Sequence, residues 1–163
     1  MIETEVKLKT NKKEIERIGE RLGKPAFFNQ KNLFFKINGG NEGGFLRIRD
    51  EKGRRVVTTK GKRLDGVFNS REENELSTNL DFEQLACFFE DWGFKKILMY
   101  EKQRAEFELN ECVLAVDILP NSETYLEIEG SEENIHKNMK LLGLDYCKIE
   151  RRSYLEILGN GKE

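Results

Sequence analysis

The chain has 163 residues, enough for one domain with a real core, and hydrophobic and charged residues make up 37% and 36% of it. This composition excludes a disordered chain, and a net charge of −2 excludes an overall basic surface for nucleic acid. No apolar run approaches the roughly 20 residues of a membrane span, and MIETEVK does not resemble a signal peptide. We therefore expect one domain over residues 1–163 that binds neither nucleic acid nor membrane.

The cysteines and the single histidine offer little chemistry. Cys87, Cys112 and Cys147 are odd in number and far apart, so they predict reduced thiols of a cytoplasmic protein, mostly buried in the core. His136 lies in NIHKNMK, which predicts a surface helix residue rather than a ligand or base.

The first half of the chain is expected to be mostly extended. A first strand ends near Lys9, and Asn11 and Glu14 resemble a capping box for a helix that Gly23 ends. GGNEGG (39–44) is predicted to be a hairpin connection and EKG (51–53) a tight turn. The extended segments are expected at 32–37, 44–50, 54–62 and 68–76.

The second half alternates between helices and strands. Helices are expected at 81–93 and, capped by Ser131, at 131–143, with a short last helix at 151–159. Strands are expected at 97–109, 112–119 and 124–130. Because short turns join consecutive strands, about eight antiparallel strands and three or four short helices are predicted, an α+β fold.

Charged residues alternate with apolar ones along most of these strands. In the first strand Glu3, Glu5 and Lys7 share one face, because successive side chains of a strand point to opposite sides. The same periodicity places further charges on one face of their strands: Arg47 and Arg49; Lys60; Arg71, Glu73 and Glu75; Lys102 and Arg104; Asp117; Glu127 and Glu129.

A solvated face of a sheet or sandwich would show the same alternation. The ordered blocks of Arg and Glu favour instead a closed sheet with the charged faces inward, a tunnel whose outer apolar faces are covered by helices. The basic residues in such a tunnel would repel one another unless a polyanion bound them. Paired carboxylates such as Glu3 with Glu5 and Glu127 with Glu129 would hold Mg²⁺ or Mn²⁺, which bridges to phosphate oxygens. Together these features predict a triphosphate-bearing small molecule as the partner.

The motifs resemble those of the CYTH superfamily, the triphosphate tunnel metalloenzymes, which include class IV adenylate cyclases, thiamine triphosphatases and inorganic tripolyphosphatases. The hallmark ExExK is Glu3-Thr-Glu5-Val-Lys7 here, and similar motifs follow in order over nearly the whole chain: LRIR (46–49), TTKG (58–61), REENE (71–75), EKQR (101–104), AVDIL (115–119) and YLEIEG (125–130).

The resemblance implies an eight-stranded antiparallel closed β-barrel, with short helices outside and these site residues. Glu3, Glu5 and Glu129 would hold the catalytic metal, and Glu73, Glu75, Asp117 and Glu127 would hold a second metal or orient basic groups. The triphosphate would be bound by Lys7, Arg47, Arg49, Lys60, Lys102, Arg104 and, unless it pairs with Glu73 or Glu75, Arg71.

The reaction is left open between two outcomes. The first expectation is a class IV adenylate cyclase-like enzyme, which converts ATP to cyclic AMP and pyrophosphate, because EKQR and RSYLEILG look like that branch. The alternative is a triphosphatase that acts on thiamine triphosphate or tripolyphosphate, and a triphosphate-binding module without turnover is a third. Lys7 and Glu5 are the expected catalytic residues. Phe34, Phe35 and Tyr125 are candidates to stack on a base. The sequence does not distinguish a monomer from a homodimer.

Overall fold

The computed structural model describes residues 1–36 and 44–159, so the predicted connection at 39–44 lies almost wholly outside the described part. The described chain forms eight strands, four α-helices and one 3-10 turn. The strands are β1 (Ile2–Thr10), β2 (Phe28–Lys36), β3 (Phe45–Glu51), β4 (Arg54–Leu64), β5 (Asn69–Thr78), β6 (Lys95–Leu109), β7 (Cys112–Ile118) and β8 (Thr124–Glu129). The helical elements are α1 (Lys12–Leu22), α2 (Phe82–Asp91), α3 (Glu132–Leu141), the 3-10 turn η1 (Tyr146–Lys148) and α4 (Tyr154–Gly159).

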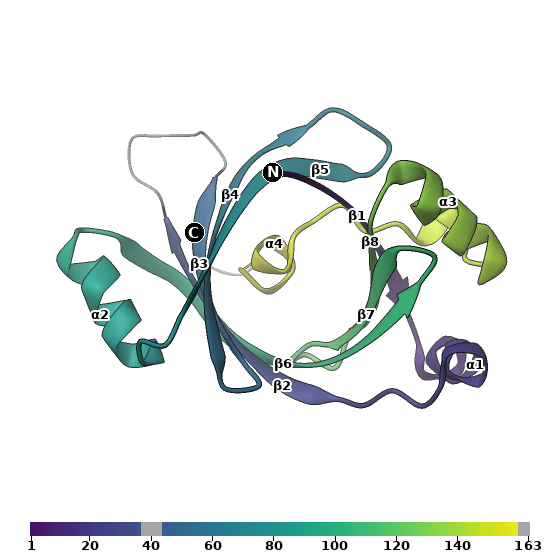
Figure 1. Ribbon diagram of the computed structural model, residues 1–163, viewed down its shortest axis with the longest axis horizontal. Coiled ribbons are helices and arrows are strands. Elements are labelled where there is room, and N and C mark those ends of the chain that lie inside the picture. Colours follow the sequence, from purple (N-terminus) through teal and green to yellow (C-terminus); the bar gives the residue numbers. More distant parts are fainter. Residues whose placement is uncertain (37–43, 160–163) are drawn as a thin grey trace.

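The strands close into one antiparallel barrel in the order β1-β5-β4-β3-β2-β6-β7-β8, and Figure 1 looks into the ring. The first strand closes it. Ile2 to Glu5 pair with β5, and Glu5 to Thr10 pair with β8. Glu5 is therefore the residue of β1 at which the two neighbouring strands meet. The predicted antiparallel barrel is confirmed.

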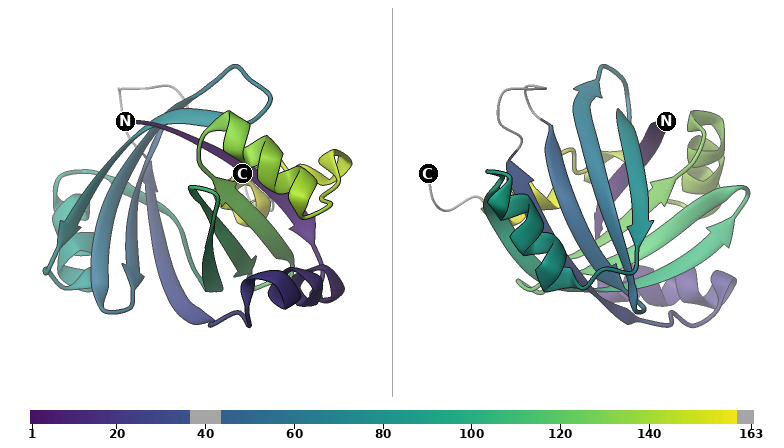
Figure 2. Two further views of the ribbon diagram at one scale, coloured as in Figure 1. Left: turned by 45° about the vertical axis from the view of Figure 1, so that its right-hand side comes forward. Right: turned by 60° about the vertical axis from the view of Figure 1, so that its left-hand side comes forward.

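Three helices cover the outside of the barrel (Figure 2). Two of their caps are at the residues expected from the sequence, with Asn11 accepting from the backbone of Glu14 and Ser131 from that of Asn134. Such side-chain caps satisfy amide groups that the first helical turn leaves unpaired. None of the helices among the described residues is long and apolar enough to cross a membrane.

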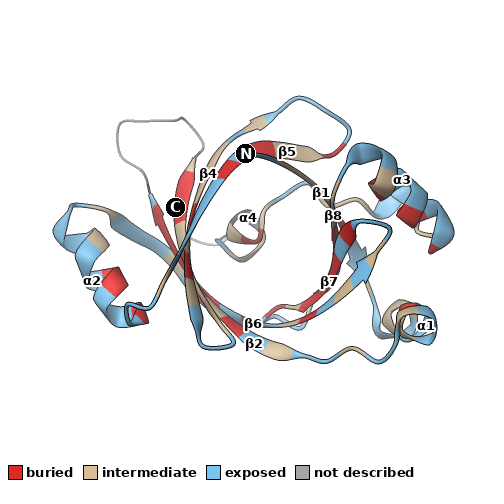
Figure 3. Cartoon of the chain, in the orientation of Figure 1, coloured by how far each residue is buried: buried red, intermediate tan, exposed pale blue. Residues whose placement is uncertain are grey.

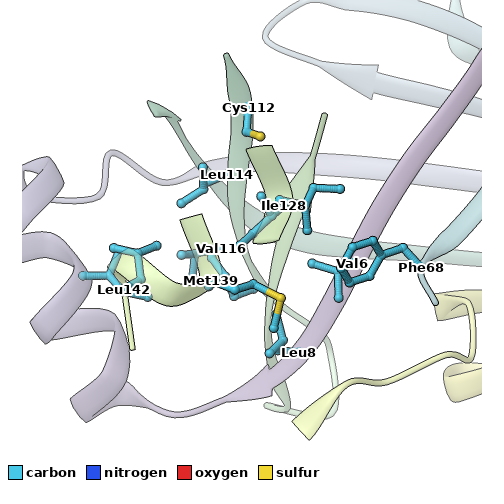
Figure 4. Packing of buried hydrophobic residues seen from close by; sticks show 12 residues of the cluster. Val6, Leu8, Phe68, Cys112, Leu114, Val116, Ile128, Met139 and Leu142 are labelled. Atoms are coloured by element: carbon cyan, nitrogen blue, oxygen red, sulfur yellow. The ribbon is translucent and has the colours of Figure 1, made fainter. Parts of the chain in front are cut away.

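The apolar faces of the strands point outward and pack under these helices. Beneath α1 and α3 lies a cluster of buried residues from β1, β7 and β8 that includes Val6, Leu114 and Ile128 (Figure 4). A second cluster places Phe35 and Ile48, from β2 and β3, beneath α2. At roughly 25 cal/mol per Å² of buried apolar surface, these clusters stabilise the fold from outside the ring and leave its interior for polar groups.

The last helix departs from the expectation that all helices lie outside. Figure 1 shows α4 within the ring, where Tyr154 and Leu155 line the interior. It packs in a third apolar cluster with inward-facing residues of the strands, among them Phe34, Phe45 and Tyr125. Apolar side chains are therefore buried inside the ring around α4 as well as outside it, while the outer surfaces of the helices are exposed (Figure 3).

Two cysteine positions differ from the expectation. Cys112 is buried in the core, but Cys87 and Cys147 are exposed, and all three are free thiols. Cys87 lies on the outer side of α2 and Cys147 in η1, so neither fills the core. His136 is exposed on α3, as predicted.

Candidate functional site

The interior of the barrel is a cavity lined mainly by charged side chains. β1 to β6, β8 and the segment around α4 contribute to it. Every predicted site residue except Asp117 lines this cavity: Glu3, Glu5, Lys7, Arg47, Arg49, Lys60, Arg71, Glu73, Glu75, Lys102, Arg104, Glu127 and Glu129. The period-2 alternation therefore identified the inner wall, because a strand of fixed register cannot turn single side chains outward.

Four carboxylates gather where β1 meets its two neighbours. Glu5 and Glu129 are direct partners across β1 and β8. Burial, together with the nearby carboxylates of Glu73 and Glu129, raises the pKa of Glu3 to about 7, and Glu73 contributes also by a hydrogen bond. Burial and the charge of Glu5 likewise raise the pKa of Glu129. These side chains hinder one another's ionisation.

Basic residues keep part of this cluster ionised. Burial opposes the charge of Glu5, but Lys60, Lys7 and Arg71 outweigh burial and hold its pKa below the ordinary value. Lys60 also forms a short ion pair with Glu73. The cluster therefore combines Glu5, whose pKa is lowered, with Glu3, whose pKa of about 7 lets it hold a proton up to near neutral pH.

The donor chemistry of this cluster fits a hard divalent cation. Carboxylate oxygens are the ligands that Mg²⁺ and Mn²⁺ prefer, and a cation would remove the repulsion that raises the pKa values of Glu3 and Glu129. Within residues 1–36 and 44–159, no three His, Cys, Asp or Glu side chains are already arranged to hold an ion. Metal binding would require these side chains to draw together.

The arginines of β3 form a second, basic part of the cavity. Arg49 donates to Glu75 at 3.1 Å, and Arg47 donates to Thr58 at 3.3 Å. The Nε atoms of both arginines are buried and have no hydrogen-bond partner. Burial, and then the charge of Arg47, lowers the pKa of Arg49. Buried cationic donors without partners are the features of an anion-binding surface.

Asp117 lies behind the lining and holds three side chains. It accepts hydrogen bonds from Lys102 at 2.8 Å, from Arg104 at 2.8 and 2.7 Å, and from the Tyr154 hydroxyl at 2.8 Å. Burial opposes its charge, but Arg104 and Lys102 outweigh burial and hold its pKa far below the ordinary range. Asp117 is 0% exposed, so of its two expected roles the geometry matches the orientation of basic groups.

The two inner lysines have different partners. Lys7 donates to the carbonyl of Arg152 at 2.9 Å and lies 3.7 Å from Glu127. Lys102 is bound to Asp117, and burial, followed by the charge of Arg104, lowers its pKa to about 8. Both lysines line the cavity, so their charges add to its positive potential.

Aromatic residues of the lining were only partly predicted. Phe34 lines the cavity, whereas Phe35 belongs to the outer core and Tyr125 is packed beside Tyr154. Tyr100, Phe45 and Tyr154 line it as well and had not been singled out. Tyr100 and Phe45 lie two residues before Lys102 and Arg47, so the alternation along their strands predicts that they face inward. Tyr154 lies in a helix, where this alternation gives no prediction.

Comparison with known proteins places the chain in a family. Residues 1–154 match the CYTH domain. The protein named "Putative adenylate cyclase MJ0240" of Methanocaldococcus jannaschii is 29% identical over 180 residues, covering 98% of this chain and 99% of its own.

Solved structures share the fold. PH1012 of Pyrococcus horikoshii superposes with a TM-score of 0.82 at 25% identity, covering 94% of this chain and 98% of its own. A Hippeastrum protein, titled as an adenylyl cyclase homologue with a dominant triphosphatase activity, gives a TM-score of 0.69 at 18% identity, over 99% of this chain and 96% of its own. With the family match spanning nearly its whole length, the chain belongs to the CYTH domain family.

Proposed function

We propose that this protein is a metal-dependent triphosphatase, which hydrolyses the terminal phosphate of a triphosphate bound in the barrel. The observation that carries the proposal is the pairing of two features in one cavity. The buried Nε atoms of Arg47 and Arg49 have no hydrogen-bond partner, although Arg49 Nε lies 3.8 Å from Glu51, and the carboxylates around Glu5 repel one another. A triphosphate with its cation would satisfy both at once.

The residues of the chain would act chiefly by positioning and charge neutralisation, as is usual in phosphoryl transfer. Arg47, Arg49 and Arg104 would bind phosphate oxygens, and Lys7 and Lys102 would add charge at the inner end. Glu3, Glu5 and Glu129, joined by Glu73, would hold Mg²⁺ or Mn²⁺, which supplies Lewis acidity and charge neutralisation when bound. A water oxygen forms the new bond to the terminal phosphorus, the bridging P–O bond breaks, and the diphosphate leaves with that electron pair.

Hydrolysis is favoured over cyclisation by the packing of the aromatic residues. Phe34 is 3% exposed and lies between Phe45 and Tyr100, with ring centroids 5.1 and 5.9 Å away. Phe35 and Tyr125 are 0% and 1% exposed. None of the three candidates for stacking on adenine therefore presents a free ring face. A triphosphatase needs no such face, because its organic group can remain outside the charged cavity.

Adenylate cyclase activity is the second candidate. It is supported by the name of the M. jannaschii relative, which matches this chain end to end, and by EKQR and RSY in the sequence. In that reaction the ribose 3′-hydroxyl would attack the α-phosphorus and pyrophosphate would leave. A binding module without turnover is the third candidate, but it has no evident use for the carboxylate cluster.

Product analysis tests the proposal. The purified protein is incubated separately with ATP, thiamine triphosphate and tripolyphosphate, with Mg²⁺ or Mn²⁺, from pH 7 to 10. We expect orthophosphate from at least one substrate, and none from Glu5→Gln, while the exposed control Glu16→Gln retains full activity. Cyclic AMP from ATP would establish the cyclase instead. Binding without any product from the wild type would leave only the binding module.

A further inference from the structure

Tyr154, the first residue of α4, occupies the inner end of the cavity. It is 7% exposed and lines the cavity from within the ring, as the position of α4 in Figure 1 indicates. Backbone contacts fix the segment that leads to it. The Glu150 amide donates to the Lys7 carbonyl at 2.7 Å, and Ile149 forms a β-bridge with Leu8. Arg63 pairs with Glu156 at 2.6 Å on the other side.

The tyrosine ring is shared by two cations. The ammonium of Lys7 lies 4.3 Å from the ring centroid, and that of Lys102 lies 4.5 Å from it. A cation within about 6 Å of an aromatic face is attracted by the ring quadrupole. The Tyr154 hydroxyl meanwhile donates to Asp117, which also holds Lys102 and Arg104. One side chain thus contacts, directly or through one carboxylate, three cations that line the cavity.

An aromatic ring suits this position for an electrostatic reason. A further carboxylate between the two lysines would add negative charge to that of Glu127 and Asp117, which already pair with Lys7 and Lys102. A ring attracts both ammonium groups without adding negative charge, so more of the positive potential of the cavity is retained. It also limits the freedom of two long side chains, which would otherwise lose rotamer entropy when a ligand orders them.

We propose that Tyr154 is a positioning residue: its ring holds the ammonium groups of Lys7 and Lys102, and its hydroxyl fixes Asp117, so that three cations are preset for the inner phosphate of the ligand. The inference rests on the proposed triphosphate site and adds a residue of the C-terminal helix to it. Its alternative is that Tyr154 serves only to pack α4 into the barrel.

The test measures the binding of inorganic tripolyphosphate by calorimetry in the presence of a chelator, so that neither turnover nor metal is required. The wild type is compared with Tyr154→Phe, Tyr154→Leu and substitutions of Tyr154 by phenylalanines with increasing ring fluorination, which weakens the ring face at nearly constant shape. We expect Tyr154→Phe, which keeps the ring but loses the hydrogen bond to Asp117, to bind about 3-fold more weakly. We expect Tyr154→Leu to bind on the order of 10-fold more weakly, and affinity to fall stepwise with fluorination.

Leu158→Ala is the matched control, because Leu158 packs α4 into the same apolar cluster as Tyr154. A flat fluorination series overturns the inference, and so does a Leu158→Ala variant that loses as much affinity as Tyr154→Leu. If Tyr154→Leu does not fold, the fluorinated series decides alone. A wild type that binds no tripolyphosphate rejects the proposed function itself, whereas binding with a flat series rejects only the role of Tyr154.

Discussion

Glu5 on β1 and Glu129 on β8 face each other directly across an antiparallel pair, and both side chains point into the barrel. Like charges in directly opposed positions destabilise a sheet. The basic neighbours of Glu5 offset part of this cost, but burial, together with the neighbouring carboxylates, still raises the pKa values of Glu3 and Glu129. The barrel thus tolerates a strained group of charges at the position where a metal–triphosphate complex would bind.

Replacing Glu3 should make the metal-free protein more stable. The folded state keeps a proton on Glu3 up to about pH 7, whereas the unfolded chain releases it near 4.5. Because the folded state binds more protons in this window, the stability of the wild type falls as the pH rises through it. Glu3→Gln should therefore show a higher Tm at pH 8 and a flatter profile between pH 5 and 7. Identical profiles for the variant and the wild type would contradict the account.

Divalent cations should stabilise the protein in a pH-dependent way. Metal ligands must be deprotonated, and burial with the neighbouring carboxylates raises the pKa of Glu3 to about 7, so protons compete with the cation more strongly at pH 5.5 than at pH 8. At about 100 times its dissociation constant, Mg²⁺ or Mn²⁺ should add roughly 2.7 kcal/mol at pH 8 and much less at pH 5.5. EDTA should reverse the rise in Tm. An equal rise in Glu5→Gln would place the cation elsewhere.

The β3 arginines should be needed for their geometry as well as their charge. Arg47→Lys and Arg49→Lys keep one positive charge but lose the planar fork and the unpartnered Nε donor. Each should weaken tripolyphosphate binding about 10-fold, which corresponds to ~1.4 kcal/mol. Calorimetry without metal measures this. Arg54→Lys is the control, since Arg54 is exposed and bonded to Ser77; an equal loss there would indicate a nonspecific charge effect.

Asp117 should matter for folding as well as for binding. Asp117→Asn leaves the buried Lys102 and Arg104 without their shared carboxylate, and an uncompensated buried charge costs about 3–5 kcal/mol. Urea unfolding should report a loss of this size. In contrast, Glu123→Gln breaks the exposed pair with Lys9 and should cost about 1 kcal/mol or less. Comparable losses in both variants would refute the proposed role of Asp117.

The barrel and its charged lining could be predicted from two features of the sequence. The two-residue period places Glu3, Glu5, Arg47 and Arg49 on the face opposite to the apolar residues of their strands, and the ordered blocks of Arg and Glu favour the inside of a closed sheet for that face. The inward direction of the polar residues also explains why the start of one strand was not predicted. β2 begins at Phe28 rather than near Asn32, because the inward residues of its first half, Gln30 and Asn32, are polar and resemble a loop in the sequence.

Other features depend on contacts between distant segments. The position of α4 inside the ring follows from the docking of Tyr154 on Asp117, 37 residues away, and no local pattern encodes it. The sequence likewise could not distinguish an Asp117 that binds metal from one that holds Lys102 and Arg104. That distinction depends on which side chains lie next to the carboxylate in the folded protein. Here Lys102, Arg104 and the Tyr154 hydroxyl all donate to it.

The most direct test of the central claim is to follow oxygen from water during turnover. ATP or tripolyphosphate, whichever is converted faster, is turned over with Mg²⁺ or Mn²⁺ in ¹⁸O-labelled water, and the products are analysed by mass spectrometry. The account predicts one labelled oxygen in orthophosphate and none in the diphosphate product, because water attacks the terminal phosphorus. Unlabelled cyclic AMP with pyrophosphate, or label in the diphosphate product, would contradict it.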